Sequence, residues 1–97
     1  MTRALRKDRA AESDLIGIWL YTVGSWGEAQ ADRYLVLLED GIRGVAKAPK
    51  KGRRRDAIRP TYWSRKIEHH VVFYTFTDDE VRIRVLHEVM DVGKHLE

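Results

Sequence analysis

The chain has 97 residues, enough for one small domain, and its 43% hydrophobic and 34% charged residues are typical of a soluble globular protein. It contains no cysteine, which excludes a disulfide scaffold, a thiol nucleophile and any cysteine-based metal site. The start of the chain is charged, and no apolar run approaches the roughly 20 residues that cross a bilayer. We therefore expect one domain over residues 1–97, cytoplasmic, with no cofactor and no membrane contact.

The positive charge is concentrated in one segment. The whole chain has 18 Lys and Arg against 15 Asp and Glu, a formal net charge of +3. Residues 43–66 contain ten of these basic residues and a single acid, Asp56, so the remainder of the chain is net acidic. Two interpretations stay open: a solvated loop that keeps the protein soluble, or an electrostatic anchor for an acidic protein segment or for DNA.

The first third of the chain predicts a short strand around residues 3–6 followed by a helix. Asp8 is a candidate N-cap, and apolar residues recur at every third or fourth position over residues 9–23. Gly24 is expected to end this helix.

A second helix is predicted directly after the first. Residues 25–28 match the S-x-x-E capping box, in which Ser25 and Glu28 satisfy backbone donors reciprocally. Helical spacing of apolar residues continues to about Lys47, and Pro49 stops it. Because one to three residues join the two helices, they must form an antiparallel hairpin.

The last third of the chain predicts strands. A basic loop follows Pro49, and period-2 segments rich in β-branched and aromatic residues come after it. Strands are predicted near residues 62–67, 70–76 and 81–87, with a tight turn at 68–69 and a polar hairpin loop at 77–80.

The final strand is predicted to be half-buried because its side chains alternate in polarity. We expect Val81, Ile83 and Val85 to face the core, and Arg82, Arg84 and Leu86 to face the other side.

The element order β-α-α-β-β-β predicts an α+β fold, in which the antiparallel helical hairpin packs on one face of a small, mainly antiparallel sheet. The other face of that sheet is left uncovered, so we expect a partner protein there.

Several short segments follow one another in a family-specific order. Residues 10–19 contain the pattern A-x-x-D-L-x-x-I-W, and residues 26–35 fit W-G-x-x-Q-A-x-R-Y-L. Further matches are Pro49, Gly52-Arg53, Ile58-Arg59-Pro60, residues 70–74, 85–87 and 90–91, and His95-Leu96. In these segments the sequence resembles the ParE branch of the RelE/ParE toxin superfamily over nearly its whole length.

Two positions depart from the pattern of that branch. Its members usually have glycine after Ile-Arg-Pro and a basic residue soon after it, whereas this chain has Thr61, and Arg65 and Lys66 supply the charge later. Its members also usually have a glycine-containing turn before His70, where this chain has Glu68 and His69.

The resemblance implies the toxin of a bacterial toxin–antitoxin pair. Such toxins are neutralised by a small ParD-like antitoxin, whose ribbon-helix-helix part binds operator DNA and whose C-terminal segment wraps the toxin. Free toxins of the ParE branch act on DNA gyrase and block replication, and they bind their target rather than catalyse a reaction. No direct sequence-specific DNA binding by the toxin is expected.

Two groups of candidate contact residues follow from the resemblance and the predicted layout. We expect an antitoxin-binding groove formed by Trp63, Arg65, Arg82, Arg84 and Leu86. We expect target contacts from Arg53, Arg54, Arg55, Arg59, His87, Met90, Asp91 and His95.

The alternative function is that of a ribosome-dependent mRNA endoribonuclease of the RelE kind. That chemistry needs a base, a proton donor and cations for the phosphate. Val71 stands where such enzymes carry an arginine, and no tyrosine follows Tyr74. The only candidates for these catalytic groups are His70, His87, Arg84 and Tyr62, although His70 is expected to be structural. A family member that has lost its toxicity is the third possibility.

Overall fold

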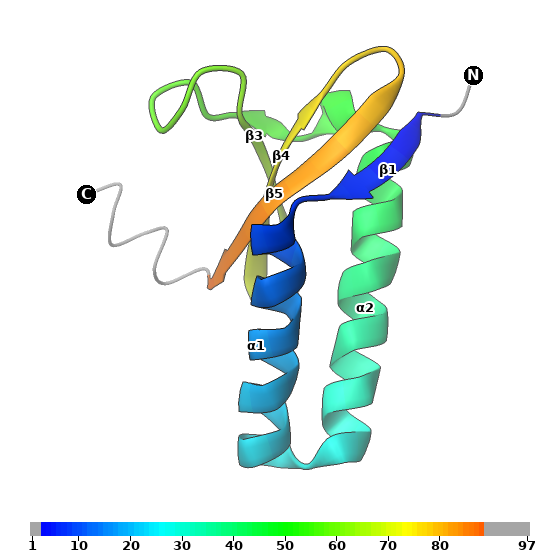
Figure 1. Cartoon of the computed structure of the whole chain (residues 1–97), viewed down its shortest axis with the longest axis vertical. Coiled ribbons are helices and arrows are strands. Elements are labelled where there is room, and N and C mark those ends of the chain that lie inside the picture. Colours follow the sequence, from blue (N-terminus) through cyan, green and yellow to red (C-terminus); the bar gives the residue numbers. More distant parts are fainter. Residues whose placement is uncertain (1–2, 89–97) are drawn as a thin grey trace.

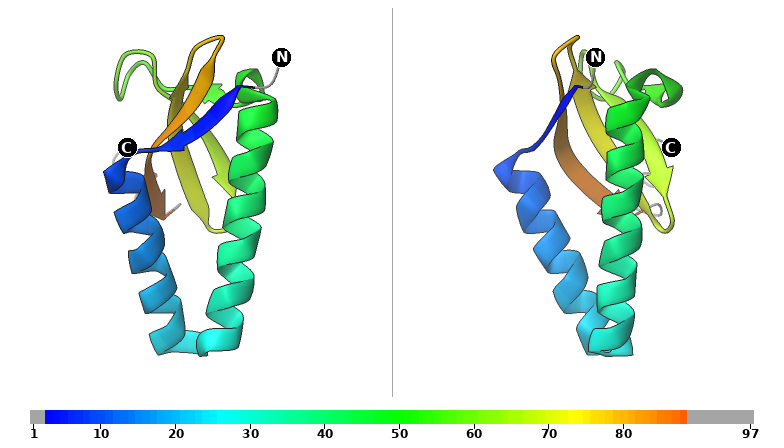
Figure 2. Two further views of the ribbon diagram at one scale, coloured as in Figure 1. Left: turned by 45° about the vertical axis from the view of Figure 1, so that its right-hand side comes forward. Right: turned by 90° about the vertical axis from the view of Figure 1, so that its right-hand side faces the viewer.

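The computed structural model describes residues 3–88, which form a helical hairpin on one face of a five-stranded sheet (Figure 1). The elements are β1 (Ala4–Lys7), α1 (Arg9–Trp26), α2 (Glu28–Lys47), the 3-10 helix η1 (Pro49–Lys51), β2 (Arg53–Arg54), β3 (Trp63–Ile67), β4 (His70–Phe76) and β5 (Glu80–Glu88). Strand order is β1-β5-β4-β3-β2; β1 is parallel to β5 and the other pairs are antiparallel. Both helices lie on the same side of this sheet (Figure 2), which confirms the α+β prediction.

A single residue, Gly27, joins the two helices. Its φ of 89° lies in the left-handed region that favours glycine, and its N–H donates to the carbonyl of Val23 at 2.9 Å. The antiparallel hairpin is confirmed, but the predicted end of α1 at Gly24 is wrong. The capping box is wrong as well, because Ser25 lies in the last turn of α1 and α2 begins without a side-chain cap. One residue with positive φ is enough to reverse the chain, so the helix continues through Gly24.

Asp8 stands at the N-cap of α1, as predicted, yet its carboxylate does not cap the helix. Instead it accepts hydrogen bonds from Arg82 at 3.1 Å and from Arg84 at 3.0 Å. Charge-assisted bonds to two guanidiniums are stronger than a neutral bond to a helix N–H. Burial alone would raise the pKa of Asp8, but the bonds and charges of Arg82 and Arg84 outweigh it and hold the pKa below its ordinary value.

Asp8→Asn tests this bridge between the start of α1 and β5. At pH 7 the variant should lose about 1 kcal/mol of unfolding free energy, because the amide keeps the shape but not the charge. Since the pKa of Asp8 is lowered on folding, the stabilisation is present above the ordinary value of 3.8 and is lost as the pH falls below it. Urea denaturation at pH 7 and near pH 2.5 should therefore show a difference that disappears in acid. Asp78→Asn, in the exposed β4–β5 turn, is the control and should change little at either pH.

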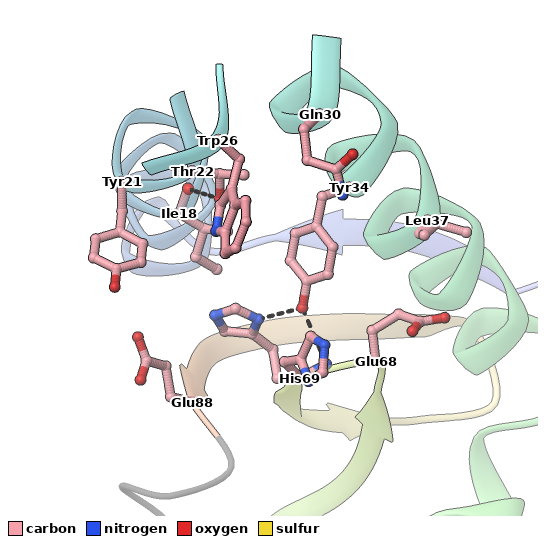
Figure 3. Close-up of a pocket in the computed structure, with 11 residues that line it drawn as sticks. Ile18, Tyr21, Thr22, Trp26, Gln30, Tyr34, Leu37, Glu68, His69 and Glu88 are labelled. Atoms are coloured by element: carbon pink, nitrogen blue, oxygen red, sulfur yellow. Dashed lines mark hydrogen bonds between the residues drawn. The ribbon is translucent and has the colours of Figure 1, made fainter. Parts of the chain in front are cut away.

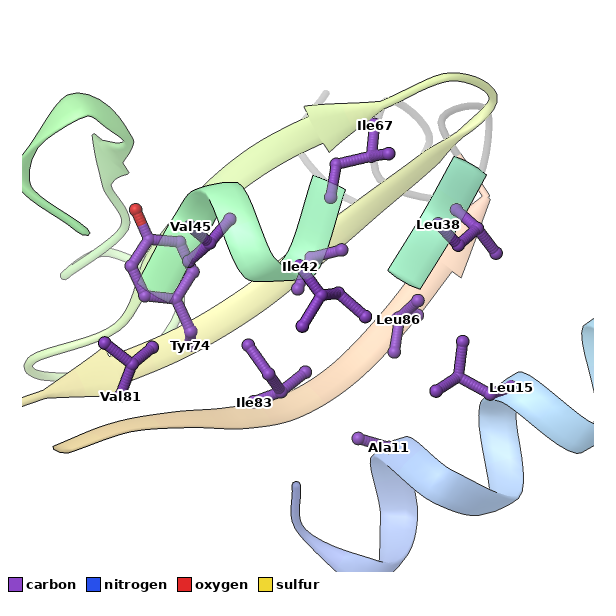
Figure 4. Packing of buried hydrophobic residues seen from close by; sticks show 11 residues of the cluster. Ala11, Leu15, Leu38, Ile42, Val45, Ile67, Tyr74, Val81, Ile83 and Leu86 are labelled. Carbon is purple, nitrogen blue, oxygen red and sulfur yellow. The ribbon is translucent and has the colours of Figure 1, made fainter. Parts of the chain in front are cut away.

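The core lies between the hairpin and the sheet (Figure 4). α2 supplies its centre, because the side chains of Leu38, Ile42 and Val45 are completely buried. The helical spacing of these three residues explains why α2 packs along its whole second half, whereas α1 contributes only its first turns. The cluster consists of Ala11, Leu15, Leu38, Ile42, Val45, Ile67, Val72, Tyr74, Val81, Ile83 and Leu86.

A β-bulge in β5 reverses the predicted alternation. Phe73 pairs with Val85 but Tyr74 pairs with Ile83, so Arg84 is an extra residue on β5. Beyond the bulge Leu86 faces the helices and is buried in the core, while Val85 lies on the opposite face. The predicted orientations of Val85 and Leu86 are therefore wrong, and those of Val81, Ile83 and the two arginines are confirmed.

The sheet face opposite the helices, which we call the open face, is not bare. Val71 and Phe73 are buried there, and Tyr62 and Val85 pack against them. The expectation of an uncovered face therefore needs correction at its centre, where a second small apolar cluster has formed. The polar remainder of this face, including Arg82 and Arg84, is half exposed.

Two polar residues of the first-helix motif have structural roles that the sequence did not reveal. Asp14 accepts the backbone N–H of Leu86 at 2.9 Å, beyond the point where β1 stops pairing with β5. Trp19 donates its indole N–H to Asp32 at 2.9 Å and so ties α1 to α2. Asp14 thus replaces a missing strand partner, which satisfies a backbone donor that would otherwise be unpaired.

Candidate protein-interaction surfaces

The residues predicted to form one antitoxin groove lie on both sides of the sheet. Arg82 and Arg84 are on the open face, held by Asp8. Leu86 is 4% exposed and lies in the core beneath the helices. Trp63 and Arg65 also lie on the helix side, because they pair with Tyr74 and Val72 of the core cluster. The structure therefore does not bring these five residues together, and only the arginine pair remains on the open face.

The exposed cations between α2 and β3 gather at one end of the molecule, opposite the Gly27 turn (Figure 1). We call this set the basic end: Lys47, Lys50, Lys51, Arg53, Arg54 and Arg59. The acid nearest to it in sequence, Asp56, is already engaged, because it accepts from the Thr61 N–H at 3.1 Å and pairs with Arg54 at 2.9 Å. The surface therefore keeps a large excess of positive charge.

Arginines of the basic loop differ in what they contact. Arg55 is half-buried and donates to the Ser64 hydroxyl at 2.8 Å, so it holds the loop onto β3. Arg54 lies over the Trp63 ring at 6.0 Å, and Arg59 lies over the Tyr62 ring at 5.9 Å. These cation–π contacts leave the guanidinium edges open to solvent. Of the four predicted target contacts in this loop, Arg55 is structural and the other three are exposed.

Of the remaining predicted target contacts, only His87 lies within the described residues, and it does not join the basic end. His87 is exposed on the open face, edge-on to Phe73 at 5.7 Å, in the part of β5 that pairs with Val71. The basic loop instead borders the opposite end of β4, where Gly52 meets Tyr74. Met90, Asp91 and His95 lie outside the described residues.

The four candidate nuclease residues do not lie together. His70 faces the helices, where its Nδ1 lies 2.7 Å from the Tyr34 hydroxyl, and burial lowers its pKa. His87 and Tyr62 flank Phe73 on the opposite face of the sheet. Arg84 is bound to Asp8 and to the Thr75 hydroxyl. His70 therefore cannot act on a phosphate that the other three residues would hold on the open face.

Both departures from the family pattern coincide with strained backbone. Within residues 3–88, the only non-glycine residues with positive φ are Thr61 at 67° and Glu68 at 56°. Thr61 stands where the resemblance implies glycine, and Glu68 lies in the turn for which it implies a glycine-containing sequence. A side chain in this region costs about 1–2 kcal/mol, and a β-branched one such as Thr61 is especially disfavoured.

Thr61→Gly should therefore stabilise the protein. The relief of strain, less the extra flexibility of glycine in the unfolded chain, leaves a gain of about 0.5–1 kcal/mol. Ala57→Gly is the matched control, because it lies in the same exposed loop without a positive φ, and it should destabilise slightly. Thermal unfolding of the three proteins measures the difference; equal losses in both variants would contradict the strain at Thr61.

A pocket of about 610 Å³ lies between the β3–β4 turn and the half of the hairpin that is next to Gly27, which we call the far half (Figure 3). No residue pattern in the sequence predicted this pocket. The signal was present in α1, where Tyr21 and Trp26 continue the apolar character of the helix away from the core-facing side. We call this the hairpin pocket; it is lined by Ile18, Tyr21, Thr22, Trp26, Gln30, Tyr34, Leu37, Glu68, His69, His70 and Glu88.

A family model described as the ParE toxin of the type II toxin-antitoxin system, parDE, matches residues 5–92. The chain belongs to the ParE toxin family. "Toxin ParE1" of Mycobacterium tuberculosis is 39% identical over 89 residues, which cover 90% of this chain and 91% of that protein. "Toxin ParE" of Escherichia coli is 37% identical over 88 residues, which cover 89% and 85%.

A solved structure has the same fold as this ParE-family chain. The "Chromosomal ParDE TA system from P. aeruginosa" superposes with a TM-score of 0.80 at 18% identity, covering 91% of this chain and 97% of the other. The family match confirms the resemblance to the ParE branch that was seen in the sequence, and the superposition confirms the fold. The family is not known as enzymatic. No helix in residues 3–88 has the length and hydrophobicity to span a membrane.

Proposed function

We propose that this toxin inhibits DNA gyrase, and thereby replication and growth, and that a ParD-like antitoxin neutralises it. The family match over residues 5–92 carries the proposal. In this function the toxin acts by binding, and its surface rather than a reactive side chain decides its effect.

Two features of the surface support a binding toxin over a ribonuclease. The candidate nuclease residues are divided between the two faces of the sheet, with His70 engaged by Tyr34. The basic end has exposed Lys and Arg side chains, which suit an enzyme that is bound to DNA, because its substrate contributes closely spaced phosphates.

The two partners are assigned to different surfaces. Arg53, Arg54 and Arg59 of the basic end are the proposed contacts with DNA-bound gyrase. Arg82 and Arg84 are the proposed antitoxin contacts on the open face, where an antitoxin carboxylate would compete with Asp8 for the two guanidiniums.

The purified protein should be tested in gyrase supercoiling and DNA-cleavage assays, and in parallel on ribosomes translating a reporter message. We expect loss of supercoiling with accumulation of cleaved DNA, and an intact message. Cleavage of the message with unimpaired supercoiling would overturn the proposal in favour of the ribonuclease. Absence of both effects, from protein shown to be folded, would indicate a family member without toxicity.

A further inference from the structure

The far half of the helical hairpin exposes large apolar side chains. Trp26 is 74% exposed, Tyr21 69% and Leu37 46%, and all three line the hairpin pocket. In Figure 1 the hairpin extends well past the edge of the sheet, so the sheet does not cover this half. Aromatic side chains grouped around a pocket of this size are typical of a protein-interaction site.

The floor of the hairpin pocket is preorganised by a hydrogen-bonded group. The hydroxyl of Tyr34 accepts the backbone N–H of His69 at 3.0 Å and shares a hydrogen bond of 2.7 Å with Nδ1 of His70. The Tyr34 ring also stacks against the His69 ring, with centroids 6.2 Å apart. Tyr34 therefore fixes the β3–β4 turn to α2, and the pocket is present before any partner arrives.

The rim of the hairpin pocket is acidic. Glu68 from the turn and Glu88 from the end of β5 line it; burial raises the pKa of Tyr34, and these two charges add to that rise. Within residues 3–88 neither carboxylate forms an ion pair. A ligand of the pocket thus meets apolar rings inside and negative charge at the edge.

The molecule is polarised along the hairpin. Near the Gly27 turn, residues 21–36 contain two acidic residues, Glu28 and Asp32, and one basic residue, Arg33; with Glu68 and Glu88 of the pocket rim this end is net acidic, whereas the basic end lies at the other end of α2. The 20 residues of α2 separate the two ends by about 30 Å. DNA phosphates would be repelled from the acidic end, and two copies of the chain meeting at this end would repel each other.

We propose that the hairpin pocket is an antitoxin-docking site, which binds an amphipathic segment carrying a bulky apolar side chain beside a lysine or arginine. The apolar side chain packs between Trp26 and Tyr21, and the cation pairs with Glu68 and Glu88. This inference rests on the proposed antitoxin partnership and deepens it.

Isothermal titration calorimetry with the small protein encoded beside the toxin gene tests the site. Trp26→Ala should weaken binding at least about tenfold, as truncation of a central aromatic contact does. Glu88→Lys should weaken it by a similar factor, and a Lys→Glu change in the antitoxin segment should restore it. The matched controls are Leu20→Ala, an exposed apolar residue of α1 outside the pocket, and Asp78→Lys; both should bind within about twofold of the wild type.

The possible outcomes distinguish failure of the docking site from failure of the proposed function. If the unaltered toxin does not bind the antitoxin, the partnership itself fails. If it binds, and the folded pocket variants bind as tightly as the controls, the docking site fails. Sedimentation of the toxin alone completes the test: self-association abolished by Trp26→Ala would assign the pocket to a second copy and overturn the proposal.

Discussion

Replacing Gly52 with alanine is expected to destabilise the protein by about 2–3 kcal/mol, the usual cost of forcing atoms into a packed interior. A Cβ at this position would overlap the Tyr74 hydroxyl and approach the Ser64 carbonyl to 2.8 Å. Tyr74 cannot move aside, because it is completely buried and donates to the Pro49 carbonyl at 2.7 Å. For a domain of this size the melting temperature should fall by roughly 10 °C or more.

The matched control for this substitution is Gly17→Ala. Gly17 lies inside α1 and a Cβ there meets nothing within 4 Å, so alanine should stabilise the helix by about 0.5–1 kcal/mol. Denaturation in urea measures both variants. A Gly52→Ala protein as stable as the wild type would show that the loop does not approach Tyr74 as described.

The double charge reversal Lys51→Glu and Arg53→Glu should reduce gyrase inhibition at least about tenfold. Both side chains are exposed at the basic end, and each reversal replaces attraction to phosphate by repulsion. The same loss should appear in the wild type as the salt concentration rises, because screening weakens contacts between exposed charges. Supercoiling assays over a range of toxin and salt concentrations measure both effects.

A control for net charge is available on the helices. Arg9→Glu with Arg33→Glu changes the total charge equally but at exposed positions away from the basic end. This variant should inhibit gyrase nearly as well as the wild type. Equal losses in the two double variants would mean that total charge alone matters, and no loss in either would remove the basic end from the gyrase contact.

The order and kind of the elements were predictable from periodicity, because each helix and strand has a regular apolar side. The bulge at Arg84 was not, since an extra residue is recognised only when β5 is aligned with β4. That one residue moves Leu86 into the core and so removes it from the predicted groove.

The role of Asp8 could not be predicted from its neighbours in the sequence either. Its partners, Arg82 and Arg84, come 74 and 76 positions later in the chain, and only the sheet brings them beside it. The hairpin pocket depends on the hairpin being longer than the sheet that supports it, which no local pattern encodes. The aromatic residues on the exposed side of α1 were the only sign of this pocket in the sequence.

The pairing of β1 with β5 determines when during synthesis the domain can fold. β5 lies between β1 and β4, and it supplies Val81, Ile83 and Leu86 to the core. Until residue 88 has left the ribosome, β1 has no partner strand and the hairpin lacks a large part of its packing surface. Contacts between segments that are far apart in the sequence form late and slowly. A growing chain of this toxin therefore cannot complete its sheet or its core before β5 has been synthesised.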